Sequence, residues 1–390
     1  MIAFGTYDAA RHPRTAVLVA GLRAHGVKVT ELNRPLGFST AERVRMLQQP
    51  WRLPALAARL LRCWAVLVGD AVRHRRAEGR PAAVLVGYLG HFDVLLARVL
   101  YPRSVVVLDH LVFAGDTAAD RGAAGLRVRL LTGLDRLAVA CADVVVTDTD
   151  EHRRMLPDPD KGVVVLVGAP DEWRAPRAPR APRASRVEPA PSLVELVETR
   201  VSTSSTGEAD GGLSVVFFGL FTPLQGAPVL AAALRDAVAA GAALRVTMVG
   251  TGQDLPRARE VLATTPGVTW HDWVEPGELP ALVAAHDVCL GIFGDTPKGL
   301  RVVPNKVYQG LAAGCVVVTS DTPPQRRALG ENVELVPVAD AAALAAELVR
   351  LGDPAALAEA RARSARGRDR IRPQVVSEPL VAELRRRDAL

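Results

Sequence analysis

Residues 304–324 decide the fold, and they read Pro-Asn-Lys-Val-Tyr-Gln-Gly-Leu-Ala-Ala-Gly-Cys-Val-Val-Val-Thr-Ser-Asp-Thr-Pro-Pro. Asn305 is a residue type that favours a helix N-cap, so we expect a short helix over Lys306–Ala313 with Gly314 as its C′ residue. The continuous apolar run Val316–Thr319 then predicts a strand that is buried on both faces. A short helix followed at once by a buried strand is typical of a parallel α/β sheet.

Continuous runs rich in valine and leucine recur along the chain from residue 80 onward. Because they do not alternate with polar residues, they predict strands that are covered on both faces. Helical patterns separate these runs in both halves, so we predict an α/β fold with two Rossmann-like, doubly wound domains facing a cleft. The other predicted strands are Val84–Val86, Val105–Leu108, Val144–Thr147, Val163–Val167, Val215–Phe218, Leu244–Val249, Val288–Ile292 and Val333–Val336.

A proline-rich break separates the two halves. Six of the 28 prolines fall within residues 170–191, and Ala-Pro-Arg occurs three times in succession over residues 175–183. This composition predicts an extended linker; the alternative is an arm whose Arg177, Arg180 and Arg183 dock an acidic partner. The predicted parts are an N-terminal domain over 1–170, the linker over 171–213, a C-terminal domain over 214–370, and a basic helix over 371–390 that packs back on the N-terminal domain.

Composition and charge narrow the class of protein. Of the 390 residues, 49% are hydrophobic and 23% are charged, which is an ordinary globular balance and excludes wholesale disorder. The net charge is +6, but nine arginines lie within residues 41–80 and nine within 361–390. The charge therefore forms no continuous basic face, and we expect no nucleic-acid partner. Four scattered cysteines and the lack of a secretory pattern at the start predict a cytoplasmic protein.

Residues 53–76 predict an amphipathic helix with leucines and Trp64 on one face and arginines around it. Arg59 and Arg62 interrupt the apolar stretch, so we do not expect it to span a membrane. The helix either packs its apolar face into the core, which we favour, or lies on an anionic membrane surface. The arginine-rich tail over 361–390 has the same two interpretations, and the second would place the protein at the inner face of the membrane.

Basic side chains surround the start of the helix predicted at Lys306. Exposed N–H groups at a helix start, together with Lys298, Arg301 and Lys306, suit a phosphate group. Gln309 lies one turn into the helix and is placed to reach a ribose hydroxyl. The alternative is a capped core helix with solvated basic residues.

With its neighbours, this stretch resembles the nucleotide-sugar signature of GT-B glycosyltransferases, closest to the retaining group 1 (family 4) class. Phe218–Gly226 resembles the first strand and loop of that family's C-terminal domain, and Val249–Gln253 resembles its second strand end. In the N-terminal half, Phe4–Asp8 with His12 resembles the acceptor-side loop. The likeness extends over nearly all of the chain apart from residues 174–213.

The resemblance implies retaining transfer of a sugar from a nucleotide-diphosphate-sugar donor to a saccharide, lipid-linked or small-molecule acceptor, as in bacterial polysaccharide synthesis. It implies no metal and no other cofactor, because helix N-termini and basic side chains stabilise the leaving diphosphate. The family positions the donor sugar with a histidine at a strand end, for which His110 and His91 are candidates, beside Asp109. The implied donor-site residues are Gly219, Gln225, Gly226, Gly250, Gly252, Lys298, Arg301, Asn305, Lys306 and Gln309, and the implied acceptor-side residues are Gly5, Thr6, Tyr7 and His12.

The sequence departs from the family pattern around the diphosphate. Leu220 and Gln225 stand where family members commonly place Arg and Lys, and Arg301 and Gln309 replace the paired acids of the Glu-x7-Glu element. We expect Arg301, together with Lys298, to supply the missing positive charge.

Other classes of function remain open at this point. The residues Asp148–Asp150 spell the DxD of metal-dependent transferases, but they lie where the family has a simple strand-end aspartate. A dinucleotide site over Gly250–Leu255 with Asp272 lacks its third glycine. A nucleotide-sugar 2-epimerase shares the two-domain architecture. A non-catalytic subunit that binds a nucleotide sugar or a partner transferase would explain Leu220 and Gln225.

Overall fold

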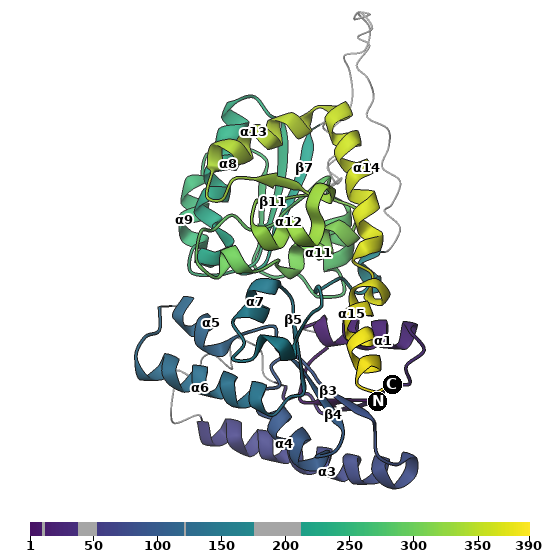
Figure 1. Ribbon diagram of the computed structural model, residues 1–390. Coiled ribbons are helices and arrows are strands. Elements are labelled where there is room, and N and C mark those ends of the chain that lie inside the picture. The colour runs from purple at the N-terminus through teal and green to yellow at the C-terminus, as the bar shows by residue number, and fades with distance from the viewer. Residues whose placement is uncertain (10–11, 38–52, 121, 175–211) are drawn as a thin grey trace, which may run out of the picture.

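The computed structural model describes residues 1–9, 12–37, 53–120, 122–174 and 212–390 and contains two parallel six-stranded sheets, each flanked by helices (Figure 1). The predicted α/β fold with two doubly wound domains is confirmed. Residues 175–211 lie outside the described part of the chain, so the linker and the alternative docking arm remain predictions for most of their length.

The N-terminal sheet has the strand order β2-β1-β3-β4-β5-β6, and all its neighbours are parallel. Its valine runs pair in register, for example Val84 with Val106 and Val107 with Val144. Its strands are β1 (Ile2–Gly5), β2 (Thr30–Asn33), β3 (Ala83–Val86), β4 (Val105–Asp109), β5 (Val144–Thr147) and β6 (Gly162–Val164). Its helices are α1 (Arg14–Ala24), α3 (Leu53–Glu78), α4 (Asp93–Leu100), α5 (Ala114–Asp120), α6 (Leu126–Ala140) and α7 (Asp150–Arg154).

The C-terminal sheet has the order β12-β11-β10-β7-β8-β9 and is again parallel throughout. The order reverses beside β7 and β10, where open α/β sheets place their ligands. Its strands are β7 (Leu213–Phe218), β8 (Leu244–Val249), β9 (Val268–His271), β10 (Val288–Leu290), β11 (Val316–Ser320) and β12 (Glu334–Val336). Its helices are α8 (Ala227–Ala239), α9 (Leu255–Val261), α10 (Leu279–Ala284), α11 (Asn305–Ala312), α12 (Pro323–Leu329), α13 (Ala341–Gly352) and α14 (Pro354–Arg370).

Local boundaries differ from the sequence expectation at helix α11 and at several strand ends. Helix α11 begins at Asn305, so the N-cap is Pro304 and the prediction of Asn305 as the cap is wrong by one residue. Pro304 is extended, with φ −73° and ψ 154°, and its ring suits the entry to a helix. Gly314 follows the helix with φ +85°, the left-handed conformation expected for a C′ glycine. Strand β6 ends at Val164, earlier than predicted, because Val167 packs in the C-terminal core.

The C-terminal end of the chain crosses back to the N-terminal domain. Helix α14 lies along the C-terminal domain, and α15 (Pro373–Arg386) packs against α1 (Figure 1). Leu380 and Leu384 of α15 are buried in one core cluster with Leu18 and Leu22 of α1. The apolar face of α15 is therefore buried against α1, and the C-terminal tail links the two domains.

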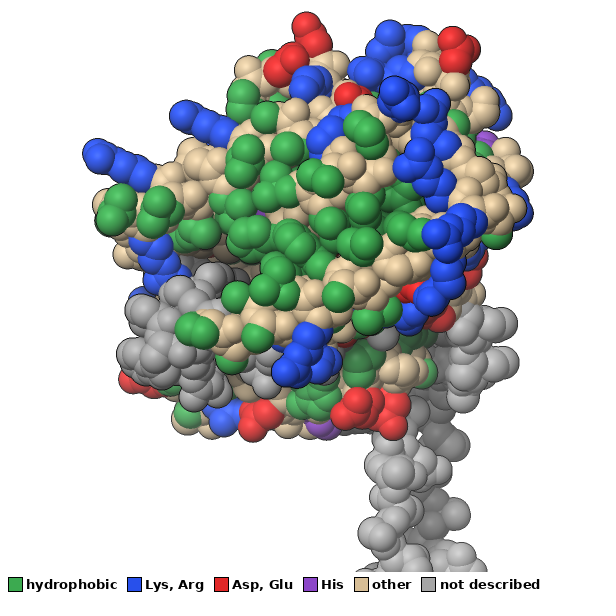
Figure 2. Space-filling model, turned by 90° about the horizontal axis from the view of Figure 1, so that it is seen from below, with side chains coloured by type: hydrophobic (Ala, Val, Ile, Leu, Met, Phe, Trp, Pro, Cys, Tyr) green, Lys and Arg blue, Asp and Glu red, His purple; other side chains and the backbone are tan. Residues whose placement is uncertain are grey.

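Helices α3, α4 and α6 form the surface of the N-terminal domain that lies farthest from the C-terminal domain (Figures 1 and 2). Leu67 and Ala71 of α3 are buried, and Trp64 packs against the same cluster. The favoured expectation, that this helix packs on the core, therefore holds for one of its faces. None of the helices in the described residues is both long enough and apolar enough to cross a bilayer.

Candidate functional site

Glycines at two neighbouring strand ends let the C-terminal domain's loops touch backbone to backbone. A Cβ on Gly250, after β8, would lie 2.0 Å from the carbonyl oxygen of Gly219, after β7. A Cβ on Gly252 would lie 2.3 Å from the carbonyl oxygen of Phe221, whose N–H donates to Thr251 O at 2.9 Å. Each glycine also has a positive φ of at least 126°. Glycine is thus required at both positions of this glycine platform, because a side chain there would overlap the backbone of the loop after β7.

Gly226 serves the same purpose on the other side of β7. It is the N-cap of α8 with φ +66°, and a Cβ there would lie 2.4 Å from the backbone nitrogen of Gly294. The loops that follow β7 and β10 are therefore held in direct contact. Gln225 is buried just before this turn, where its side chain faces α11.

Lys306 of α11 is a buried cation without an acidic partner in the part of the chain that the structure describes. Its Nζ donates to Gln225 Oε1 at 2.6 Å and lies 3.6 Å from the centroid of the Phe217 ring. Burial lowers its pKa to about 7 from an ordinary 10.5. A Cβ on Gly219 would lie 3.2 Å from this Nζ, so the ammonium group sits directly beside the glycine platform. This geometry suits an anion that approaches over Gly219.

The other two basic residues assigned to the diphosphate reach the N-terminal domain instead. Lys298 Nζ donates to Thr117 Oγ1 at 2.7 Å, and Arg301 pairs with Asp116 at 2.6 Å; both partners are on α5. Thr149 Oγ1 also donates to Arg301 O at 2.8 Å. In this conformation the two basic side chains that we expected to bind phosphate therefore form contacts between the domains.

These contacts show how the domains face one another. Helices α5 and α7 follow β4 and β5, while Gly299–Arg301 and α12 follow β10 and β11. A further ion pair joins Glu151 of α7 to Arg327 of α12. The carboxyl ends of both sheets thus meet at one interface, which is where ligand-binding residues of α/β domains gather.

Asn305 and Gln309 lie on α11 with Lys306. Both are half-buried, and neither side chain forms a hydrogen bond with another described residue. Gln309 follows Lys306 by three residues and so lies on the same side of the helix one turn later. Both amides are available to a ligand that reaches the start of α11.

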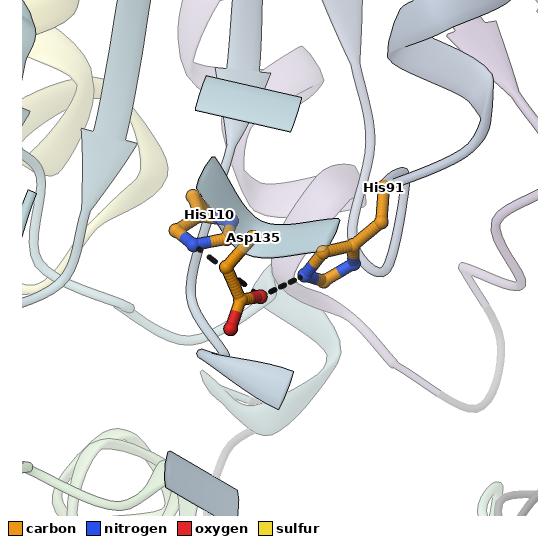
Figure 3. Close-up of side chains that lie close together, drawn as sticks. All are labelled: His91, His110 and Asp135. Atoms are coloured by element: carbon orange, nitrogen blue, oxygen red, sulfur yellow. Dashed lines mark hydrogen bonds and ion pairs between the residues drawn. The ribbon is translucent and has the colours of Figure 1, made fainter. Parts of the chain in front are cut away.

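In the N-terminal domain, His91 and His110 converge on Asp135 (Figure 3). His91 Nε2 lies 2.9 Å from Asp135 Oδ1, and His110 Nε2 lies 3.9 Å from the same oxygen. The two imidazole centroids are 5.1 Å apart, and the Phe113 ring lies 4.5 Å from that of His110. Burial, aided by His91, lowers the pKa of His110 to about 3, and neither of its ring nitrogens has a hydrogen-bond partner among the described residues. His110 is therefore a neutral imidazole with unused hydrogen-bonding capacity.

Asp135 was not among the residues proposed from the sequence. Burial opposes its ionisation, but hydrogen bonds from His91 and from the backbone N–H groups of Gly115 and Ala114 hold its pKa below the usual range. The only available signal was a lone acidic residue inside the basic and apolar helix α6. Its role here is to fix the start of α5 and the orientation of His91.

His91, His110 and Asp135 also have the residue types of a metal site, with one ligand atom from each lying within 4.8 Å of the others. Both carboxylate oxygens of Asp135, however, already accept hydrogen bonds: Oδ1 from Ala114 and Oδ2 from Gly115. The arrangement therefore fits a hydrogen-bonded cluster better than a metal centre.

Asp109 points to a different partner from its neighbour His110. Its Oδ1 lies 3.2 Å from Arg14 Nε, and Arg14 also donates to the carbonyl oxygens of Leu166 and Val165. Burial raises the pKa of Asp109, although Arg14 opposes this. Asp109 thus forms a buried ion pair that joins α1 to the sheet, and its expected catalytic role stays a prediction.

The expected acceptor-side loop is fixed by Asp93, in the first turn of α4. Thr6 donates to Asp93 Oδ2 through its N–H at 2.7 Å and its hydroxyl at 2.8 Å, and Trp64 Nε1 donates to the other oxygen at 2.8 Å. A Cβ on Gly5 would lie 2.9 Å from the same carboxylate. Tyr7 donates to Glu31 at 3.1 Å, and His12 packs on the ring of Tyr88. Thr6, Tyr7 and His12 of this loop are therefore each fixed by a contact with another part of the domain.

The residues Asp148, Thr149 and Asp150 each have separate partners. Asp148 contacts His152 Nδ1 at 2.5 Å, Thr149 caps α7, and Asp150 pairs with arginines of the same helix. They do not converge as a DxD metal site would.

The alternative of a dinucleotide site gains no support from the position of Asp272. Asp272, the residue proposed to bind a ribose, is an exposed side chain paired with Arg259 at 2.9 Å.

Comparison with known proteins gives one family match, over the C-terminal domain. Residues 212–353 match the family described as glycosyl transferases group 1. No curated protein sequence matches the chain. The fold is similar to that of Anabaena HepE, solved with UDP and glucose, at 12% identity over 99% of this chain and 98% of that one, with a TM-score of 0.58.

Two further solved structures share the whole fold. A glycosyltransferase from Rickettsia africae is 11% identical over 99% of this chain and 97% of that one, with a TM-score of 0.60. A candidate UDP-N-acetylglucosamine 2-epimerase from Listeria monocytogenes is 12% identical over 100% and 96%, with a TM-score of 0.54. At these identities the likeness shows the fold alone, which is GT-B.

Proposed function

We propose that this chain, whose C-terminal domain belongs to glycosyl transferases group 1, transfers a sugar from a nucleotide-diphosphate donor to an acceptor held by its N-terminal domain. The observation that carries the proposal is Lys306, a buried ammonium group beside the glycine platform whose hydrogen-bond partner is the neutral amide of Gln225.

The charge balance at Lys306 favours a diphosphate. A buried cation without a counter-ion is costly, and an anion bound beside it restores its ordinary pKa. The N–H groups at the start of α11 add a partial positive charge from the same side. Gln225, at a position where the family commonly has a basic residue, here holds the Lys306 ammonium in place. Lys306 therefore supplies charge that Leu220 and Gln225 cannot.

The donor sugar is expected at His110. A neutral imidazole whose two nitrogens have no hydrogen-bond partner in the described part of the chain suits hydrogen bonds to sugar hydroxyls. His110 is almost fully buried, with α5 starting four residues after it, so access requires α5 to move. The contacts of Lys298 with Thr117 and of Arg301 with Asp116 hold α5 against the C-terminal domain. We therefore expect these contacts to open when the donor enters and to free both cations for phosphate.

The finer features of the reaction follow the family resemblance. We expect retention of the anomeric configuration, with the leaving phosphate acting as the base, and no metal. HepE was solved with UDP and glucose, which supports a UDP-sugar as the first donor to test. The nucleotide base is expected beside residues 270–274. This segment lies next to the loop after β8, because the N–H of Gly250 donates to His271 O. The acceptor is a saccharide, a lipid-linked or a small molecule, in bacterial polysaccharide synthesis in the cytoplasm.

Two other functions remain candidates. The fold is shared with the candidate 2-epimerase from Listeria monocytogenes, which supports an epimerase. Leu220 and Gln225 favour a subunit that binds a nucleotide sugar without turnover. Product analysis separates the three functions. A transferase releases UDP and glycosylates an added acceptor, an epimerase converts the sugar without an acceptor, and a binding subunit does neither.

Thermal unfolding with UDP, GDP and ADP tests the donor site. We expect one nucleotide to raise the unfolding temperature, and Lys306→Met to abolish the shift. Lys161→Met is the matched control, because Lys161 is a partly buried lysine of the N-terminal domain that donates to Ala142 O. No shift with any nucleotide, or an equal shift in the Lys306 variant, would contradict the proposal. Retention is then read from the anomeric proton of the product by NMR.

A further inference from the structure

One surface of the N-terminal domain is built from three neighbouring helices. Trp64 of α3 donates to Asp93 of α4, and Arg98 of α4 donates to Cys141 O at the end of α6. The order across the surface is therefore α3, α4, α6. The surface lies on the side of the N-terminal domain away from the C-terminal domain (Figure 1). It is thus free of the contacts between the domains.

Large apolar side chains are exposed on all three helices. Figure 2 looks onto this surface and shows a broad hydrophobic area bordered by lysine and arginine side chains. On α6, Leu126 and Leu130 are 72% and 66% exposed, and on α4, Val99 is 75% exposed. Such an apolar area on a globular surface marks an interaction site. The other large hydrophobic side chains exposed on α3 and α6 are Leu61, Val66, Val72 and Leu137.

The charged residues of these helices have one dominant sign. The three helices contain nine arginines and four acidic residues. Asp93 and Asp135 are buried, and Asp70 is largely buried and paired with Arg34 and Arg73. Glu78, at the end of α3, pairs with Lys28. The outward charge of the surface is therefore almost entirely positive.

Several of these arginines are available to a partner. Arg62, Arg127, Arg129 and Arg136 are exposed, and none of them forms an ion pair within the described residues. On α6 they alternate with the exposed leucines, so cation and apolar group are presented together. This is the pattern of helices that lie in the plane of a membrane, with apolar side chains among the acyl chains and basic ones among anionic headgroups.

We propose that the surface formed by α3, α4 and α6 binds an anionic lipid bilayer. A second copy of the chain is a poorer occupant, because a two-fold contact would place unpaired arginines against arginines. The basic tail is a poorer lipid-binding segment, because Leu380 and Leu384 of α15 are buried and Arg386 and Arg387 pair with Glu383. This inference is independent of the proposed transferase activity. It extends the membrane interpretation of residues 53–76 to α4 and α6.

Sedimentation of the full chain with vesicles tests the proposal. We expect binding to vesicles of mixed phosphatidylglycerol and phosphatidylcholine, little binding to phosphatidylcholine alone, and loss of binding as salt is raised. The double variant Arg127→Glu/Arg129→Glu is expected to weaken binding by about tenfold or more. Leu126→Ser/Leu130→Ser is expected to weaken binding as well, because it removes apolar side chains that would lie among the acyl chains. The variant should still fold, since both side chains are solvent-exposed in the free protein.

Two control variants separate this surface from general charge and hydrophobicity. Arg366→Glu/Arg370→Glu reverses the same charge on α14, and Val349→Ser removes an exposed apolar side chain of α13. Both should bind vesicles like the parent chain, and circular dichroism should show all variants folded. The proposal is overturned if the parent chain ignores phosphatidylglycerol, or if the α14 pair loses binding and the α6 pair does not. It is also overturned if the leucine variant only dissolves a dimer and keeps its lipid affinity.

Discussion

Two buried cations, one in each domain, differ in how their charge is met. Arg14 of the N-terminal domain has Asp109 as a counter-ion and the carbonyl oxygens of Leu166 and Val165 as acceptors. Lys306 of the C-terminal domain has an amide oxygen and an aromatic face. The charge of Arg14 is balanced by a carboxylate of the protein, while Lys306 has no negative charge beside it among the described residues. The comparison teaches that an unbalanced buried charge, more than burial itself, points to a ligand.

The largest expected effect is on the complete pair. Arg14→Met should destabilise the chain by about 3–5 kcal/mol, because it leaves Asp109 buried without its cation. Urea unfolding at pH 7 measures this. The double variant Arg14→Met/Asp109→Asn should recover much of the loss, and Lys306→Met should cost far less than Arg14→Met. If the two single variants were equally destabilising, the distinction between the cations would fail.

The next effect concerns the platform beside Lys306. Gly250→Ala should lower stability by about 1–3 kcal/mol and weaken nucleotide binding, because its Cβ would overlap Gly219 O. Gly241→Ala is the control, since Gly241 also has a positive φ, +90°, but a Cβ there meets nothing within 4 Å. The control should cost only about 1 kcal/mol and leave binding unchanged. Chemical denaturation and calorimetric titration with UDP give the two readouts.

A pH dependence follows from Lys306, whose pKa is lowered to about 7 in the folded chain. Between pH 7 and 10.5 the unfolded chain holds a proton that the folded chain has released, so this residue makes stability rise with pH in that window. Diphosphate binding needs the protonated form, so UDP affinity should fall by up to about tenfold per pH unit above 7. Titration calorimetry from pH 7 to 9 checks this, and Lys306→Met should be weak and flat. An affinity that the parent chain keeps across this range would show that the ammonium charge is not used.

The smallest effect is expected at the contacts between the domains. Asp116→Asn removes the partner of Arg301, a partly exposed pair, and should cost about 1 kcal/mol or less. Because it weakens the hold on α5, we expect a slightly larger radius of gyration in solution scattering and faster nucleotide binding. Arg235→Gln, which breaks an exposed pair with Asp236 on α8, is the control and should change neither. An unchanged association rate would argue that α5 does not limit access.

The predictable part of the fold is its buried part. Continuous apolar runs predicted β4, β5, β8 and β11 to within about a residue, because a strand that is buried on both faces needs an unbroken apolar sequence. The edge strands β2 and β9 were not predicted, because their residues are largely part-exposed. Their sequences, Thr-Glu-Leu-Asn and Val-Thr-Trp-His, contain no continuous apolar run.

The candidate site divides in the same way. Its glycines and Lys306 could be proposed from motifs, because their spacing within a strand-loop-helix unit is local. Asp93 and Asp135 could not, since each acts on a residue far away in the sequence: Asp93 on Thr6, and Asp135 on His91. The ion pair of Asp109 with Arg14 could not be read from the sequence either, because neighbouring residues at a strand end point in opposite directions and only His110 faces His91.

The sequence by itself determined two parallel α/β domains, the glycine-rich strand ends and the family resemblance of the C-terminal domain, because local spacing and burial pattern suffice for these. The tertiary structure alone decided which cations remain unbalanced. It brought Lys298 and Arg301 into contact with Thr117 and Asp116 of α5 and left Lys306 with a neutral partner. It also gathered exposed leucines and arginines from separate helices onto one surface. Charge balance and surface continuity depend on residues distant in the chain, and folding is what brings them together.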